Sequence, residues 1–506
     1  MRFLKLGFPL LMAGLFTVLF YKKMLGVNLI IFDLAILVVA VKLFKEELSS
    51  SIGKALLVAF VASGVSVVVF NSVYAKSVNI LFTITLSGYL ACGLGKASYV
   101  WFVQGIASAF ANQIIFLRTF TNIKPGWVKH RWLRWTAIGV PVVLVLLVFL
   151  SLYYHASPWL KEAMDGFITG FLTELGRFLE SIRWGLFWFF VYGLLVVNMF
   201  VQRAKGKLFR GFNPGFELRR ERQKRTGVKR SMTALLTEYK SGLVLLICLN
   251  LLLAVVNVLD IRNIWFGFSF EGQFLKELVH EGTYTLIFSV ILSILVVLFY
   301  FRGNLNFYRR NSTLKVLTHI WIGQNMLLLV SVLIRNSIYI HYYALAYKRL
   351  GVFMFLLATM VALIALIVKV RKTRSLSYFL HTNGLTVIGI LLLGCFINWD
   401  VWIARYNISH HQTAFLHLDY MAQLSEKAYP EMDLPLSTFQ EFKLQEPEYF
   451  RGFSSSVSRV AYMEPETFYA SLQRKKEAFL SEYPHRTWLE WNLADYRAFN
   501  YLSKAE

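Results

Sequence analysis

The chain has 506 residues, of which 57% are hydrophobic and only 16% are charged, and its formal net charge is +24. Soluble proteins usually carry about a quarter of charged residues, so this composition excludes a soluble protein of several domains. The positive excess does not indicate a nucleic-acid partner, because it lies in short loops between apolar segments, where membrane proteins collect Lys and Arg. Residues 399–506 instead hold 11 Lys or Arg against 15 Asp or Glu.

Long apolar runs recur along most of the chain, and each can cross a hydrocarbon layer of roughly 30 Å at about 1.5 Å per residue. We therefore predict an all-α fold, a polytopic transmembrane helix bundle of about 11 spans in a lipid bilayer, with a C-terminal helical domain. The predicted spans are 6–21, 25–44, 54–71, 78–95, 135–154, 184–201, 241–259, 283–301, 315–334, 350–369 and 377–397. A further stretch, 98–117, contains Gln104, Asn112 and Gln113, which favour an interfacial helix over a twelfth span.

Four segments follow from the distribution of apolar and basic residues. They are N-terminal transmembrane helices (1–200), a basic cytoplasmic loop (201–240), C-terminal transmembrane helices (241–398) and a soluble helical tail (399–506). Basic and acidic loops alternate in the second half of the chain, and the positive-inside rule then puts the tail outside the cytoplasm. We expect a multi-pass protein of the cytoplasmic (inner) membrane, with a protein partner for the tail.

The basic residues of 202–230 have two interpretations. They are suited to bind anionic lipid headgroups, an attraction worth about 1 kcal/mol per basic residue near the surface. They also suffice as a determinant of topology and nothing more.

Six polar residues fall inside predicted spans: Asn28, Asp33, Asn250, Asn257, Gln324 and Asn325. An unpaired Asp at a span centre costs about 3 kcal/mol, so each such residue is a functional candidate unless it joins two helices. Asn250 and Asn257 are two turns apart and share one stripe of their helix.

A second group of candidates gathers at the outer ends of spans, and we predict an outer-face binding site from it. Its members are Arg335, Tyr339, His341, Tyr343, Arg349, Asp400, Arg405 and Asn407. Aromatic and basic residues at span ends are typical of the interfacial belt. The alternative is a pocket for an anionic group, with Arg335 and Arg349 as donors.

No metal, cofactor or catalytic motif is predicted. Cys92, Cys248 and Cys395 lie inside apolar runs and have no metal-ligand spacing. His410 and His411 are adjacent, so they cannot easily face one ion together with His417.

Four short motifs resemble a family of bacterial membrane proteins, the domain of unknown function 4173. They are Leu25 to Asn28, Tyr339 to Arg349, Asn398 to Asn407, and Leu418 to Tyr420 with Leu424 and Ser425 after it. Ala344 and Ala346 stand where the family pattern has Gly and Thr, and Trp399 where it has Pro. The family carries no established activity. The resemblance therefore implies a membrane architecture and an outer-face site that includes Arg349, Asp400 and Arg405.

The sequence predicts a non-enzymatic protein of the cell envelope: a scaffold, sensor or transport-associated component with an outer-face interaction site. A transporter or channel is the first alternative, if Asp33, Asn250 and Gln324 line a polar path. A membrane-embedded enzyme acting on lipid or glycan at the outer face is the second. Asp400 and His341 would then be its candidate bases.

Overall fold

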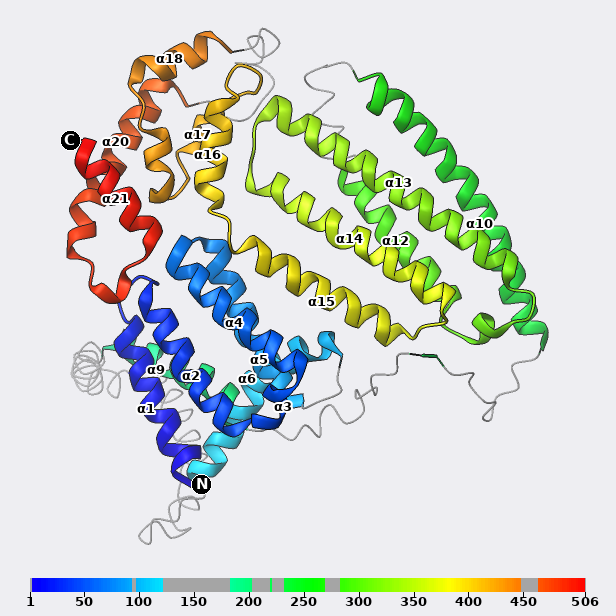
Figure 1. The fold of residues 1–506 in the computed structure, drawn as a ribbon, viewed down its shortest axis with the longest axis horizontal. Coiled ribbons are helices and arrows are strands. Elements are labelled where there is room, and N and C mark those ends of the chain that lie inside the picture. Colours follow the sequence, from blue (N-terminus) through cyan, green and yellow to red (C-terminus); the bar gives the residue numbers. More distant parts are fainter. Residues whose placement is uncertain are drawn as a thin grey trace, which may run out of the picture. The chain divides into compact units, whose positions relative to one another are not determined.

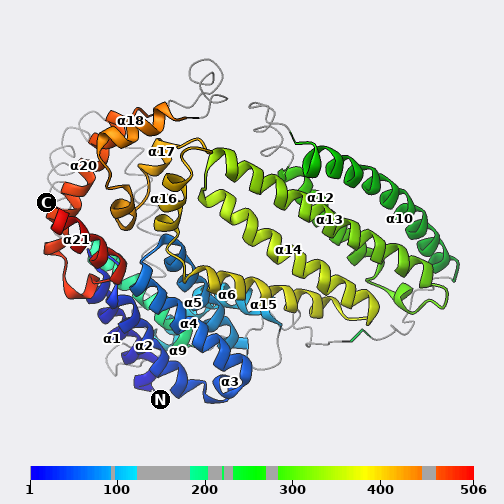
Figure 2. The ribbon, with the colours of Figure 1, turned by 45° about the horizontal axis from the view of Figure 1, so that its top comes forward.

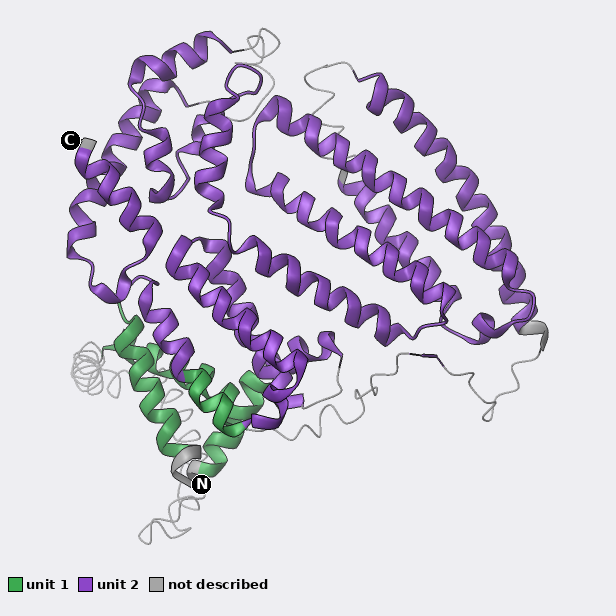
Figure 3. Cartoon of the chain, viewed as in Figure 1, with its two compact units in different colours: residues 1–23, 36–43, 107–205 green, residues 24–35, 44–106, 206–506 purple. Residues whose placement is uncertain are grey.

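The computed structural model describes residues 2–92, 97–121, 183–202, 219–220, 232–268, 283–446 and 463–505. These residues are helical apart from turns and one isolated antiparallel bridge between Arg219 and Arg374. They form two compact units, coloured separately in Figure 3. Unit 1 comprises residues 1–23, 36–43 and 107–205, and unit 2 comprises residues 24–35, 44–106 and 206–506.

Helices coincide with ten of the predicted spans, and the eleventh (135–154) lies outside the described residues (Figure 1). In the first half they are α1 (Arg2–Phe20), α2 (Val27–Leu43), α3 (Lys45–Ser49), α4 (Ser51–Phe70), α5 (Val73–Cys92), α6 (Ser98–Thr121) and α9 (Trp184–Val201). In the second half they are α10 (Met232–Asp260) with the π-helix η2 (Ile261–Phe266), α12 (Thr283–Tyr300), η4 (Asn304–Phe307), α13 (Ser312–Tyr343), α14 (Tyr347–Arg371) and α15 (Leu376–Gly394).

The tail, residues 399–506, consists of short helices. They are α16 (Trp399–Ser409), α17 (Leu418–Met421), η5 (Glu426–Met432), α18 (Leu436–Leu444), α20 (Pro465–Glu482), η6 (Tyr483–His485), η7 (Trp488–Glu490) and α21 (Leu493–Ala505). Helix α20 starts with Pro465 in its first turn, where a missing N–H costs nothing.

Seven helices in the described part of the chain are long and apolar enough to cross a membrane: α4, α6, α9, α10 with η2, α13, α14 and α15. Shorter apolar helices occur at Leu6–Phe20 and Tyr284–Tyr300. The expected 11 or 12 spans are therefore confirmed only in part. Helix α2 has just 17 residues, and α5 contains several hydroxyl and amide side chains, among them Asn79.

Helix α6 belongs to the seven, although its polar residues favoured an interfacial position. Within unit 1 the amide of Asn112 donates to the carbonyl oxygens of Asn198 and Gln202, both at 2.9 Å. Gln113 and Asn198 are also bonded through their side chains, at 2.9 Å. Because α9 and the residue after it supply these partners, the amides of α6 need no contact with water.

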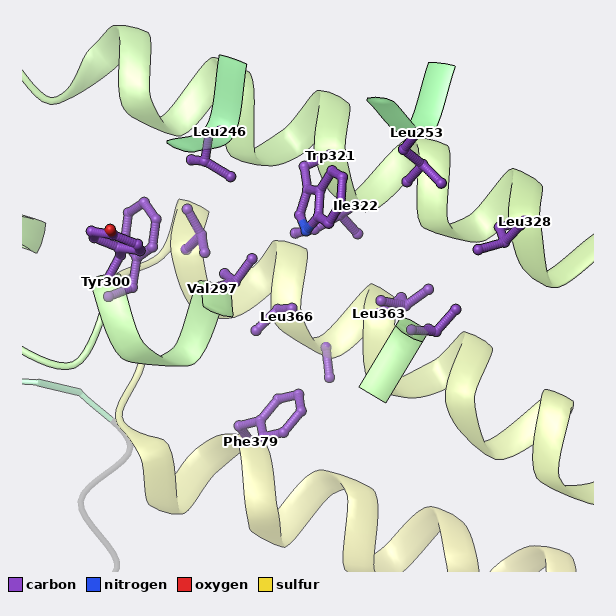
Figure 4. Close-up of a cluster of buried hydrophobic side chains, with 14 of the residues drawn as sticks. Leu246, Leu253, Val297, Tyr300, Trp321, Ile322, Leu328, Leu363, Leu366 and Phe379 are labelled. Carbon is purple, nitrogen blue, oxygen red and sulfur yellow. The ribbon is translucent and has the colours of Figure 1, made fainter. Parts of the chain in front are cut away.

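A hydrophobic core of unit 2 lies among α10, α12, α13 and α14 (Figure 4). Trp321 and Ile322 of α13 meet Leu246 and Leu253 of α10 in this core, and Leu363 and Leu366 of α14 approach from another side. Helices α10 and α13 lie side by side in Figures 1 and 2. Since α12 reverses the chain between them, they run parallel.

Helices α5 and α6 approach so closely that two glycines are required. A Cβ atom on Gly88 would lie 1.7 Å from the carbonyl oxygen of Trp101, and one on Gly105 would lie 2.0 Å from that of Ile84. Small residues at such crossings let helix backbones pack directly in a membrane.

We expect Gly88→Ala to lower the free energy of unfolding by about 1–3 kcal/mol, because the backbone of α6 must move. Thermal unfolding in detergent, followed by size-exclusion chromatography, measures this. Gly351→Ala in α14 is the matched control, since a Cβ there meets nothing within 4 Å. An equal loss of stability in both variants would contradict the close packing of α5 on α6.

Candidate functional site

The tail and the ends of two span helices share one hydrophobic core. Ile340 of α13, Leu345 of the following turn and Leu350 of α14 pack with tail residues that include Ile403, Met421, Phe439 and Phe468. Three of the predicted outer-face residues, Arg349, Asp400 and Asn407, lie between the spans and the tail. Together with Tyr347, Tyr420 and Ser425, which are not among the predicted site residues, we call them the tail clamp.

The turn from α13 to α14 is short and buried. Ala344 has φ 63° and ψ −174°, a region that is essentially reserved for glycine and costs other residues about 1–3 kcal/mol. Ala344 occupies the motif position where the resembled family has Gly, so the conformation explains that glycine. Contacts from the tail and from α14 must stabilise the strained turn.

Asn407 of α16 makes the first of these contacts. Its Oδ1 accepts the backbone N–H of Leu345 at 2.7 Å, and its Nδ2 donates to the Leu345 carbonyl oxygen at 3.1 Å. The Asn407 side chain is buried, with the residue only 2% exposed. It thus satisfies both backbone groups of a residue that water does not reach.

Arg349 makes the second contact. Its guanidinium donates to the carbonyl oxygen of Tyr343 at 2.6 Å and to that of Ala344, and it lies over the Tyr339 ring at 4.5 Å. These carbonyls end α13, where a helix leaves acceptors without intrahelical partners and its dipole attracts a cation. The geometry gives Arg349 the role of a helix cap.

Asp400 makes the third contact, from the first turn of α16. Its Oδ1 accepts the hydroxyl of Tyr347 at 2.6 Å, and its Oδ2 accepts the hydroxyl of Ser425. The N–H of Tyr347 donates to the hydroxyl of Tyr420 at 3.0 Å. A carboxylate in the first turn of a helix is also stabilised by the helix dipole. Asp400 thereby joins the start of α14 to two segments of the tail.

His417 lies beside the tail clamp and stays neutral. Its ring stacks on Tyr343 at 6.5 Å between centroids and meets Phe415 edge-on at 4.5 Å. Burial, with a smaller effect from the charge of Arg349, lowers the pKa of His417 to about 4. Burial also raises the pKa of Tyr420, so both groups are uncharged near neutral pH.

Three of the predicted outer-face residues lie apart from the tail clamp. Arg405 is exposed on α16 and forms an ion pair with Glu431 at 2.6 Å. His341 is exposed and contacts the ring of Tyr342. Arg335 is buried and pairs with Asp260 of α10, with 2.5 Å between Nη2 and Oδ1. Asp260 is not among the candidates from the sequence. An Asp at the end of an apolar run is nevertheless a signal for an ion-pair partner such as Arg335.

A second contact between tail and spans involves the Leu25 to Asn28 motif. The N–H of Val27 donates to the carbonyl oxygen of Trp491 at 3.1 Å. A Cβ on Gly26 would lie 2.5 Å from the carbonyl oxygens of Glu490 and Trp491, so this position requires glycine. The Asn28 side chain bonds the N–H of Gly26 and the carbonyl oxygen of Met24, both at 2.8 Å. Asn28 therefore shapes the surface on which the tail rests.

Asp495 completes this second contact, and sequence reasoning missed it. The carboxylate is buried and pairs with Arg486 at 3.0 Å, while Asn492 donates to it at 2.8 Å. Asn71, which ends α4 with φ 46°, also donates to it at 3.2 Å. In Figures 1 and 2 α21 lies beside this end of α4.

The polar residues inside the spans are bonded to other helices or to their own. Asp33 accepts the amide of Asn79 at 2.9 Å, and Asn79 also donates to Ser63 of α4 at 3.2 Å. A Cβ on Gly64 would lie 2.6 Å from the Asp33 carboxylate. Asp33 is thus paired with an amide from α5.

Amides also connect the parallel helices α10 and α13. Asn250 donates to the Leu317 carbonyl oxygen at 3.2 Å and accepts the amide of Gln324 at 2.9 Å. Asn257 donates to the Gln324 carbonyl oxygen at 3.2 Å. Asn325 instead bonds the carbonyl oxygen of Trp321 in its own helix, at 2.8 Å. The structure therefore brings Asn250, Asn257 and Gln324 together and leaves Asn325 apart.

The comparisons with known proteins identify a family. The family model described as a domain of unknown function, DUF4153, matches residues 34–434. The chain belongs to this family. No curated protein and no solved structure matches the chain.

The DUF4153 match carries no activity, which agrees with a family of unknown function, although its number differs from that of the family the motifs resemble. The matched region contains all six residues of the tail clamp, whereas Gly26, Asn28 and Asp495 lie outside it. Among the described residues no group of three or more His, Cys, Asp or Glu side chains could hold a metal ion.

The role of Asn407 in the DUF4153 region is testable by substitution. We expect Asn407→Ala to lower the free energy of unfolding by about 2–4 kcal/mol, because two buried backbone groups lose their partners. Arg405→Ala, on the same helix, removes only an exposed ion pair, so we expect a change below about 1 kcal/mol. Thermal unfolding of both purified variants measures the difference, and similar values would refute the assigned role.

Ala344 offers a test in the opposite direction. We expect Ala344→Gly to raise the free energy of unfolding by about 1–2 kcal/mol, since glycine adopts this conformation without strain. Ala346→Gly is the control, because Ala346 is extended at φ −150° and gains nothing from glycine. The melting temperatures should move apart, and a loss of stability in Ala344→Gly would argue against a strained turn.

Proposed function

We propose that the protein is a non-enzymatic scaffold of the cytoplasmic membrane that holds its tail in a fixed position for a partner outside the cytoplasm. The observation that carries this proposal is the tail clamp. Asp400 and Asn407 of the tail bond Tyr347 and the backbone of Leu345 at the span ends, and Arg349 caps the turn that they hold. These side chains therefore serve to attach the tail to the spans. A surface held in this way loses little conformational entropy when a partner binds.

Loop charges support the proposed orientation. The turn after α14 contains Arg371, Lys372 and Arg374, and the turn before α13 contains Arg309 and Arg310. The tail clamp is at the other ends of these two helices, which the positive-inside rule assigns to the outer side.

Exposed aromatic residues near the second contact are suited to a membrane boundary. Trp488 is 69% exposed and Trp491 is 38% exposed, and Glu490 between them accepts the N–H of Met24 at 3.2 Å. These rings thus lie near the start of α2, and Trp is common at both boundaries of a membrane. They, together with exposed Tyr496 and Tyr501, are the surface we propose for a partner or for the lipid interface.

A transporter or channel is the second candidate, and the contact between α10 and α13 favours it. The Oδ1 of Asn257 and the Oε1 of Gln324 are buried acceptors without a hydrogen-bond partner among the described residues. Buried acceptors in a polar stripe are the groups that water or a cation would contact in a hydrated path.

Cysteine accessibility distinguishes the two candidates. Single cysteines at positions 250, 257, 324, 488 and 491 are placed in a variant without Cys92, Cys248 and Cys395, and an impermeant thiol reagent is added from each side. For a scaffold we expect labelling at 488 and 491 from outside only, and none at 250, 257 or 324. A reporter fused after Glu506 checks the orientation independently.

Labelling at 250, 257 or 324 would show that water reaches the contact between α10 and α13, and the transport function would replace the scaffold. Labelling of 488 and 491 from the cytoplasmic side alone would refute the proposed orientation. Melting temperatures of the variants serve as the folding control.

A further inference from the structure

The turn between α14 and α15 gathers basic residues that are distant in sequence. Thr373 has φ 46°, a strained conformation for a β-branched residue. Its carbonyl oxygen accepts the N–H of Arg220 at 3.2 Å, and Arg219 forms the isolated bridge with Arg374. Two arginines of the predicted basic loop are thereby fixed beside the basic end of α14.

These cations have no acidic partner among the residues that the structure describes. Lys369, only 2% exposed, donates to the carbonyl oxygen of Phe301 at 3.2 Å, and the nearby charge of Arg220 repels it. Arg374 lies over the Tyr378 ring at 5.5 Å, and its Nε is buried without a hydrogen-bond partner among the described residues. Arg219 is exposed and Arg220 and Arg374 are half-buried, so an anion can reach all three arginines from solvent. Like charges gathered in one place repel each other, and an anion between them removes that cost.

Helix α15, which begins directly after this turn, exposes an apolar surface along its length. Only 6% of the apolar stretch of α15 is buried, and Leu376, Leu385 and Leu393 are 46%, 39% and 70% exposed. On α14, Ile364 is 49% exposed. An anionic phospholipid would bind both the cations and the apolar side chains, with its phosphate at the turn and its acyl chains along α15. A free phosphate ion would use the cations alone.

We propose that Arg219, Arg220 and Arg374, with Lys369 behind them, form a binding site for the phosphate group of an anionic phospholipid. Arginine is suited to this role because its guanidinium binds phosphate oxygens in pairs. The site lies at the opposite end of α14 from the tail clamp, so it does not depend on the proposed scaffold function. It turns the general attraction expected for residues 202–230 into a defined site of three arginines.

The test uses the purified full-length protein in detergent. Native mass spectrometry compares the retention of phosphatidylglycerol with that of phosphatidylcholine, in the wild type and in the triple variant Arg219→Gln, Arg220→Gln, Arg374→Gln. The double variant Arg309→Gln, Arg310→Gln is the matched control, because it removes two exposed basic residues of another turn at the same end of the spans. Thermal unfolding with added phosphatidylglycerol or inorganic phosphate is the second measurement.

We expect the wild type to retain phosphatidylglycerol preferentially and to be stabilised by it. The triple variant should lose about five-fold in affinity for each arginine removed, and the control should keep most of the preference. Equal retention in the triple variant and the control would overturn the proposal. Stabilisation by inorganic phosphate without any preference for phosphatidylglycerol would overturn the lipid as the ligand. If the triple variant does not fold, Arg374→Gln alone is compared with Arg309→Gln, and equal lipid retention there would overturn the proposal as well.

Discussion

The two hydrogen bonds between Asn407 and the backbone of Leu345 are the contact on which this end of the molecule depends. A turn between two span helices is normally exposed, and water then bonds its backbone. Here the tail covers the turn, so a side chain must supply those bonds. The left-handed Ala344 and the cap formed by Arg349 lie within the same few residues. The tail therefore completes the hydrogen bonding of the turn, whose buried backbone groups at Leu345 have their partners on Asn407.

The spans obey the same constraint with different residues. In a low-dielectric interior an amide or carboxylate must find a partner on another helix or bond its own helix. Partners on another helix are found in three pairs: Asp33 with Asn79, Asn250 with Gln324, and Asp260 with Arg335. Asn325 instead bonds its own helix. Several buried polar atoms of the described spans still lack a hydrogen-bond partner, among them the side-chain oxygens of Asn257 and Gln324, and this rule does not account for them.

Much of the architecture could be predicted from the sequence, because apolar length alone determines where a helix can cross a membrane. The ends were harder to predict. Helix α13 continues to Tyr343, beyond the predicted end at 334, because Arg335 is neutralised by Asp260 and the last turns are covered by the tail. Arg335 therefore lies inside the bundle and not at its outer face. Asn407 and Asp400 could be identified as candidates, but their partners depend on contacts across about 60 residues of sequence, which no local pattern contains.

The parallel arrangement of α10 and α13 has a consequence for how the two helices find their alignment. Asn250 bonds the carbonyl of Leu317 and Asn257 bonds that of Gln324, so the same contact recurs after seven residues on both helices. A repeat of seven residues is that of a left-handed supercoil, and these two contacts alone would not distinguish the observed pairing from one that is shifted by a heptad. The pair of Asp260 and Arg335 does not repeat. It therefore distinguishes the observed register from a shifted one, as single buried polar contacts do in coiled coils.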